Sequence, residues 1–315
     1  MKKTMISTAV LALLFASCSS DDGLTQSTLP LEGTPIQVNV AVADLQTRAG
    51  YDASNLPTEF YMNVTNPDNE KYSYKVLLKK ESGNWNSYDA TTPKKSKQML
   101  WAGDNKDVKV TASSLSLVNE SITTEVKTDQ STSDNVKLSD HLLMSTTSVT
   151  PSTNGIEVTL NHLMSKIKLI ITLGDEFEIT DDPFSKVSIE GTLPKRIYNL
   201  GTVEENVWSD VNGSNPVTAA TITPLQNSFK AANGSIHASG EYEAILVPQT
   251  IEAGNFYIWF KVKDRLFEWK STENINLDSG KEYTLKLMAG HDKVSSASFT
   301  TSAWNGGDTF SNETE

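Results

Sequence analysis

Residues 256–263 read FYIWFKVK, and apolar side chains alternate there with more polar ones. On an extended backbone the apolar set falls on one side: Phe256, Ile258, Phe260 and Val262. A period of two is typical of a β-strand that buries one face in a core. This stretch therefore predicts a strand.

The same alternation recurs along the chain, at residues 36–43, 72–79, 156–160 and 282–287. Short turn signals separate the alternating stretches, among them Asn212-Gly213, Asn233-Gly234 and Ser279-Gly280. Beyond the first residues, no window of 12 or more carries a helical apolar stripe. We therefore expect an all-β fold of antiparallel sheets packed face to face, with few and short helices.

The N-terminus predicts export. Lys2 and Lys3 precede an apolar stretch over residues 5–16, which is too short to cross a bilayer, since a helix needs about 20 residues for that. Small residues lead up to Cys18, the only cysteine, so residues 1–17 resemble a lipoprotein signal peptide. Cleavage before Cys18 and acylation of its thiol, for example with palmitate, would hold the protein on a membrane. The alternative is an ordinary signal peptide with an incidental cysteine.

Residues 18–34 are expected to form a surface linker. Its first part, Ser19-Ser20-Asp21-Asp22-Gly23, resembles the acidic tag that sends some bacterial lipoproteins to the outer face of the outer membrane. A solvated linker without an address would have the same composition. The predicted location is the cell surface, with a lipid anchor in the outer membrane.

Size and charge limit the remaining possibilities. About 300 residues follow the signal, enough for two domains, which we expect at 35–158 and 159–315. The chain has 39 acidic against 27 basic residues, a balance that disfavours nucleic acid and anionic lipid as partners. With no cysteine after Cys18, neither disulfides nor thiolate metal sites are expected in the exported protein.

No pattern predicts catalysis, a cofactor or a metal site. The four histidines stand far apart in the sequence, and no nucleophile elbow or phosphate-binding loop occurs: His141, His162, His237 and His291. The acidic pair Asp181-Asp182 lacks the alternating oxygen ligands of a calcium loop. We expect a protein without enzymatic activity.

Six tryptophans suggest a second function, because indoles can stack on sugar faces. Trp259 and Trp269 belong to neighbouring expected strands, and a shared sheet face would make a glycan site. Packing in or beside the core is the structural alternative for both residues.

Four further segments resemble a known family. Residues 160–168, LNHLMSKIK, are similar to the "NHxxxKI" segment of the fimbrillin-like (Mfa-like) subunits of bacterial type V pili. The family's other motifs have counterparts in the same order: Val247-Pro248-Gln249, the hairpin LDSGKEYTL at 277–285, and Ala303-Trp304-Asn305-Gly306-Gly307. The resemblance is strongest from residue 156 to the C-terminus and weak between about 50 and 150.

The resemblance implies two transthyretin-like β-sandwich domains and assembly into surface fimbriae. Precursors in that family are lipidated, and shaft subunits are cut after an arginine in the loop behind the first strand. Thr47-Arg48-Ala49-Gly50 occupies that place, following a first strand expected over residues 36–45. A polar run and Pro57 follow, which predicts an exposed backbone open to a protease. An ordinary loop arginine is the alternative.

A cut between Arg48 and Ala49 would allow strand exchange. The departing strand would uncover an apolar groove and an unpaired sheet edge, which a neighbouring subunit could fill by β-augmentation. The exchanged residues would be Ile36, Val38, Val40 and Val42, and the candidate donor face is Ala297, Phe299, Thr301 and Ala303. The expected partners are other fimbrial subunits. We favour a shaft subunit, with an anchor, a tip adhesin and a monomeric glycan-binding or host-binding lipoprotein as the alternatives.

Overall fold

The computed structural model describes residues 31–43, 50–103, 106–117, 120–177, 179–200, 207–211, 217–290, 293–304 and 309–310. Within these ranges strands dominate, with one α-helix, α1 (Ser133–Ser139), and one short 3-10 helix, η1 (Glu70–Tyr72). The predicted all-β class is confirmed. The described part holds no helix that is long and apolar enough to span a bilayer. The predicted signal peptide and Asn212-Gly213 lie outside the described residues.

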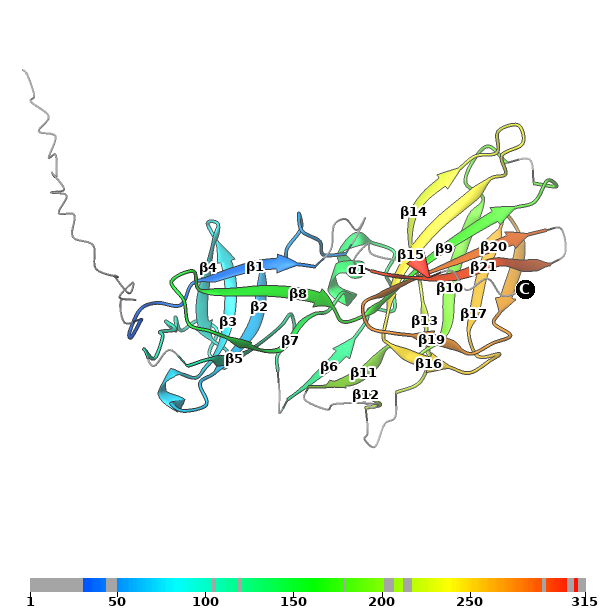
Figure 1. Cartoon of the computed structure of the whole chain (residues 1–315). Coiled ribbons are helices and arrows are strands. Elements are labelled where there is room, and N and C mark those ends of the chain that lie inside the picture. The colour runs from blue at the N-terminus through cyan, green and yellow to red at the C-terminus, as the bar shows by residue number, and fades with distance from the viewer. Residues whose placement is uncertain are drawn as a thin grey trace, which may run out of the picture. The chain divides into compact units, whose positions relative to one another are not determined.

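The first half of the described chain forms a seven-stranded sheet in the order β1-β8-β7-β5-β2-β3-β4. Neighbours are antiparallel except β1 and β8, which run parallel (Figure 1). The strands are β1 (Val38–Val42), β2 (Glu59–Thr65), β3 (Tyr74–Glu81), β4 (Asn84–Asp89), β5 (Val108–Ser113), β7 (Leu142–Val149) and β8 (Ile156–His162).

One face of this sheet closes over an apolar cluster that we call the N-terminal core. Period-two alternation sends every second side chain of each strand into it. Its fully buried members include Phe60, Met62, Val76, Val110 and Ile156. The alternating stretches at 36–43, 72–79 and 156–160 thus correspond to β1, β3 and β8.

The second half contains two facing sheets. A six-stranded sheet has the order β14-β15-β9-β20-β21-β22, and a four-stranded sheet has the order β13-β10-β17-β18. The strands are β9 (Ser165–Leu173), β10 (Phe184–Thr192), β13 (Ala220–Ile222), β14 (Leu225–Lys230), β15 (Ser239–Leu246), β17 (Tyr257–Val262), β18 (Arg265–Lys270), β20 (Lys281–Ala289), β21 (Val294–Ala303) and β22 (Thr309–Phe310).

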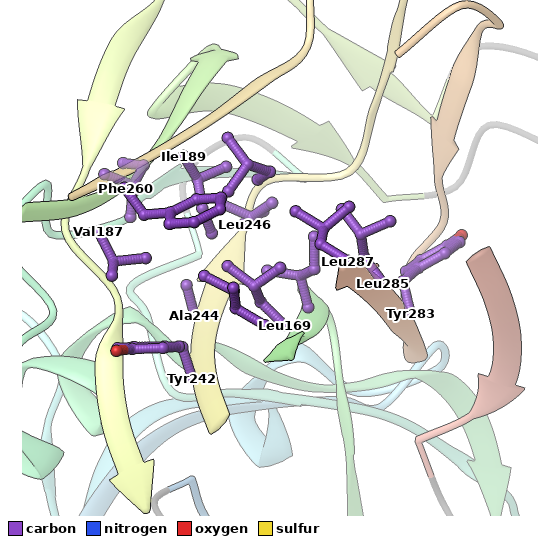
Figure 2. Packing of buried hydrophobic residues seen from close by; sticks show 14 of the residues in the cluster. Leu169, Val187, Ile189, Tyr242, Ala244, Leu246, Phe260, Tyr283, Leu285 and Leu287 are labelled. Atoms are coloured by element: carbon purple, nitrogen blue, oxygen red, sulfur yellow. The ribbon is translucent and has the colours of Figure 1, made fainter. Parts of the chain in front are cut away.

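Side chains from both sheets interdigitate in a second cluster, the C-terminal core (Figure 2). Leu169, Leu246 and Leu285 come from the six-stranded sheet, and Ile189 and Phe260 come from the four-stranded sheet. All five are fully buried. This face-to-face packing is that of a β-sandwich. That the chain forms two transthyretin-like domains divided at residue 158 stays a prediction.

Two small sheets complete the molecule. β16 (Gln249–Ile251) pairs with β19 (Ile275–Leu277), and a three-stranded sheet has the order β12-β11-β6. In it, β6 (Ser121–Glu125) lies between β5 and β7 in sequence, yet it pairs with β11 (Lys195–Asn199), which also pairs with β12 (Trp208–Ser209). The helix α1 follows β6, and its Val136 is buried in the C-terminal core. Residues 121–139 therefore join the two halves.

Candidate functional site

The strand β1 buries one face in the N-terminal core. Ile36 and Val42 are 8% and 4% exposed, and Val38 and Val40 between them are half-buried against the same core. The alternate side chains, from Gln37 to Ala41, are exposed. The apolar face expected from the sequence is thus the face that packs. The role of these four residues in exchange stays a prediction.

Only one edge of β1 is paired within the described part of the chain. Its neighbour is β8, with Val38 opposite Ile156 and Val42 opposite Leu160. The backbone N–H of Ile156 donates to the carbonyl of Gln37 at 2.8 Å, which seats the start of the strand. β1 is therefore an edge strand held by a single ladder.

The residues just before β1 are tied to a different segment. Three backbone hydrogen bonds join them to residues 99–101: the N–H groups of Gly33 and Ile36 donate to Trp101 and Met99, and the N–H of Trp101 donates to Thr34, over 2.9–3.0 Å. Removal of β1 would have to break these bonds as well as the β8 ladder.

Gly155 allows the close approach of β1 to the start of β8. Its φ of +82° is a conformation that side chains rarely adopt. A Cβ at this position would also overlap the backbone carbonyl of Gln37. Glycine is needed here both for the turn and for the close packing of Gln37, just before β1.

A cavity runs along the unpaired edge of β1. It has a volume of about 640 Å³ and is lined by residues 36–40, by Leu56, and by the hairpin of β3 and β4, including Trp85. Trp85 packs edge-on against buried Phe60, with ring centroids 5.0 Å apart. Because β1 and β4 are the two edge strands of the same sheet, the cavity lies between the sheet's two ends.

The predicted lipidation and cleavage residues, Cys18, Arg48 and Ala49, lie outside the described residues. The chain just after the predicted cut is fixed in place. The N–H of Tyr51 donates to Asp140 Oδ2 at 2.9 Å, and Asn55 Nδ2 donates to the carbonyl of Gly50 at 3.1 Å. Burial and the nearby Asp140 carboxylate raise the pKa of the Tyr51 phenol.

Asp140 also anchors a buried cluster that reaches the end of β21. Its Oδ1 lies 2.8 Å from His162 Nδ1, and both side chains are fully buried. The His162 ring stacks on Trp304, with centroids 3.9 Å apart and planes within 6°. Lys166 lies beside the indole and pairs with Glu282 at 3.2 Å. The cluster thus links the segment after the predicted cut to the end of the candidate donor strand.

The candidate donor strand β21 is paired along its length with β20. Phe299 lies opposite Leu285, stacks on Tyr283 at 5.7 Å, and packs on the C-terminal core, as Thr301 and Ala303 continue the same face. A bulge at residue 297 interrupts the alternation, because Ser298 and Ser296 pair with consecutive residues of β20. The side chain of Ala297 is outside the described set.

The expectation that Trp259 and Trp269 share a sheet face is wrong. Trp269 lies opposite Ile258 across β17 and β18, so it faces the C-terminal core, where it packs edge-on against Phe256. Trp259 lies opposite Glu268, on the other face. Directly opposed residues share a face and neighbours along a strand do not, so the two indoles cannot form one platform.

The described residues contain no group of three or more His, Asp or Glu side chains that could hold a metal. His141 and His162 are buried, His237 lies 3.4 Å from Asp175, and His291 is outside the described residues. Burial lowers the pKa of His141, against the opposing effect of its hydrogen bond to the backbone carbonyl of Glu125.

The sequence patterns did not predict three residues of this site: Tyr51, Asp140 and Trp85. Tyr51 and Asp140 meet across 89 positions of chain, so no local spacing could have paired them. Trp85 had a weak signal, since Trp85, Ser87 and Asp89 alternate with Asn84, Asn86 and Tyr88 without a consistent apolar face.

Comparisons with known proteins agree with this architecture. No curated protein matches the sequence. A candidate cell adhesion protein from Bacteroides ovatus ATCC 8483 has a similar structure, with a TM-score of 0.60 and 16% identity, over 86% of this chain and 98% of that one. Another, from Bacteroides uniformis ATCC 8492, has a TM-score of 0.54 and 15% identity, over 86% and 98%. The sequence profile of the fimbrillin-like proteins matches residues 37–304, and the chain belongs to that family.

Proposed function

We propose that this protein is a non-enzymatic structural subunit of a cell-surface fimbria. Its precursor is held in the outer membrane by lipid on Cys18, is cut between Arg48 and Ala49, and joins other subunits by strand exchange. Membership of the fimbrillin-like family supports a fimbrial or adhesive role. The steps of assembly are proposed from the residues.

The observation that carries the proposal is the way β1 packs against the rest of its sheet. Its apolar face fills the N-terminal core, while its outer edge borders an open cavity and has no strand partner among the described residues. A strand with these properties can leave without opening the rest of the sheet. The segment after the cut would stay, because Tyr51 is bonded to Asp140.

Departure of β1 would leave a site that favours a replacement strand. Ile36 and Val42 alone represent about 3–6 kcal/mol of apolar burial. The backbone groups of β8 that bond to β1 would also lose their partners. A strand from a neighbouring subunit would restore both terms.

The proposed donor is β21, with Phe299 as its largest apolar side chain. To donate, β21 must leave β20, and Trp304 must leave its stack on His162. The neighbouring subunit's groove would then replace a partner that β21 has within its own chain. A subunit with both a groove and a donor fits a shaft position better than an anchor or a tip.

The test is Arg48→Ala in cells that carry the assembly machinery, with Lys94→Ala as the control, since Lys94 is an exposed basic residue elsewhere in the first half. We expect Arg48→Ala to remain a lipid-anchored monomer and Lys94→Ala to form ladders on gels run without boiling. Ladders formed normally by Arg48→Ala would refute cut-and-exchange. A sharp monomer for the protein trimmed to begin at Ala49 would favour a monomeric surface lipoprotein instead.

A further inference from the structure

A second cavity in the described part of the chain lies apart from β1. It has a volume of about 720 Å³ and opens between the two small sheets. Strands β11 and β12 line one side, and the start of β16 and the turn after β19 line the other. This volume falls in the range of small-ligand sites, which is about 300–1,000 Å³.

Four side chains form one wall of this cavity. Tyr198 lies directly opposite Trp208 across the β11–β12 pair, and their rings meet edge to face with centroids 5.2 Å apart. Two positions along each strand, on the same face, Arg196 Nε donates to Asp210 Oδ1 at 2.8 Å. An aromatic pair and an ion pair thus lie side by side at the cavity.

The wall is held rigidly by its surroundings. Trp208 Nε1 donates to Ser279 Oγ at 3.0 Å, and Arg196 Nη1 donates to the carbonyl of Pro248 at 2.8 Å. Gln249 is 8% exposed and bonds both the N–H and the carbonyl of Leu193. These bonds fix the indole and the guanidinium before any ligand arrives, which lowers the entropic cost of binding.

The aromatic rings are only partly used by the protein itself. Tyr198 and Trp208 pack on the small cluster of Ile122, Leu143 and Leu163, and both remain half-buried because they also line the cavity. The Asp210 side chain is 66% exposed, so its carboxylate can accept further hydrogen bonds. The site therefore offers apolar ring surface next to charged hydrogen-bonding groups.

We propose that this cavity binds a neutral pyranose unit of a glycan. A pyranose has an apolar C–H face that suits an indole and hydroxyl groups that suit a carboxylate and a guanidinium. Asp210 and Asp278 line the cavity, and Arg196 is the one cation among the described lining residues. The whole chain is also acidic, and both features disfavour anionic sugars. The proposal does not depend on strand exchange.

The test is a titration of the full-length chain with the methyl glycosides of glucose, galactose and mannose at millimolar concentrations, followed by tryptophan fluorescence and by saturation-transfer NMR. Sialic acid serves as the anionic probe. Trp208→Ala is expected to weaken the best neutral ligand about 10-fold or more, and Asp210→Asn about 5-fold. Trp259→Ala, which changes an indole outside the cavity, is the matched control and is expected to leave affinity unchanged.

The outcomes decide the proposal in either direction. Loss of binding in Trp208→Ala with retention in Trp259→Ala supports it. If Trp208→Ala does not fold, because its ring packs on Ile122, the exposed Asp210→Asn variant decides alone. The proposal is overturned by the absence of binding to any neutral glycoside, by affinity that Asp210→Asn leaves intact, or by tighter binding of sialic acid. We expect Trp208→Ala and Asp210→Asn to form the same assembly ladders as the parent, so this test is independent of the test of strand exchange.

Discussion

Strands β1 and β9 have similar apolar patterns but different positions in their sheets. Each runs parallel to one neighbour, β1 to β8 and β9 to β20. β9 is also paired with β15, and every second side chain along it is 0% exposed: Ile167, Leu169, Ile171 and Leu173. β1 has one neighbour among the described strands, and the middle of its apolar face is half-buried. Position in the sheet, more than sequence pattern, distinguishes these two strands, and it is why β1 is the strand proposed to leave.

The largest expected effect is at β9. Leu169→Ala should lower the free energy of unfolding by about 2–5 kcal/mol, since it leaves a cavity between two facing sheets. Val40→Ala in β1 should cost less than about 1 kcal/mol, because its side chain is half-buried and smaller. Urea unfolding of both variants measures the difference. Equal losses would mean that β1 is as firmly built in as β9.

A smaller effect should separate the steric overlap between residue 155 and Gln37 from the strain of a side chain at positive φ. Gly155→Ala and Gly83→Ala both place a side chain at positive φ, but only the Cβ at 155 would overlap Gln37, since the Cβ at 83 meets nothing. We expect Gly155→Ala to be less stable than Gly83→Ala by about 1–3 kcal/mol.

Urea unfolding measures this difference in stability. Limited proteolysis between residues 43 and 50 gives a second measurement for the two glycine variants. Release of β1 after such a cut should be faster in Gly155→Ala. The same release rate and stability for both glycine variants would show that β1 does not depend on the close approach at Gln37.

The smallest effect is a dependence on pH from His141. Burial lowers its pKa in the folded state, so below the ordinary histidine value, about 6.5, the unfolded chain binds a proton that the folded chain does not. Stability from this group is complete above that pH and is lost as pH falls toward the lowered pKa. Urea midpoints at pH 7.5 and 5.5 should differ less in His141→Gln than in the parent. The same pH difference in His141→Gln and in the parent would contradict this origin.

Much of the fold follows from alternation alone. The stretches that predicted strands are β1, β3, β8, β17 and β20, because each puts apolar residues at every second position on a core face. Fold class and family are confirmed. The alternation along β17 already puts Trp259 and Phe260 on opposite faces of the sheet. Trp269 could not be placed in this way, because alternation within each strand does not fix the register between β17 and β18.

The rest depended on contacts that leave no local pattern. β6 reads SITTE, with one large apolar residue, and its partner β11 is some 70 positions away in the chain. The buried contact of Asp140 with His162 and the cavity at Trp208 arise only when such distant segments meet. Cys18 and Arg48 are read from sequence alone and stay predictions.

The pairing of β6 with β11 has a mechanical consequence. Five residue pairs join them, from Ser121 opposite Asn199 to Glu125 opposite Lys195. In the proposed filament, tension between the two halves would act on the short covalent link between His162 and Ser165 and on the contacts that join the halves. With β6 in place, pulling the halves apart loads a ladder of backbone hydrogen bonds in addition to one covalent thread. If the chain is part of a fimbria, as proposed, this ladder would reinforce the connection between its two halves.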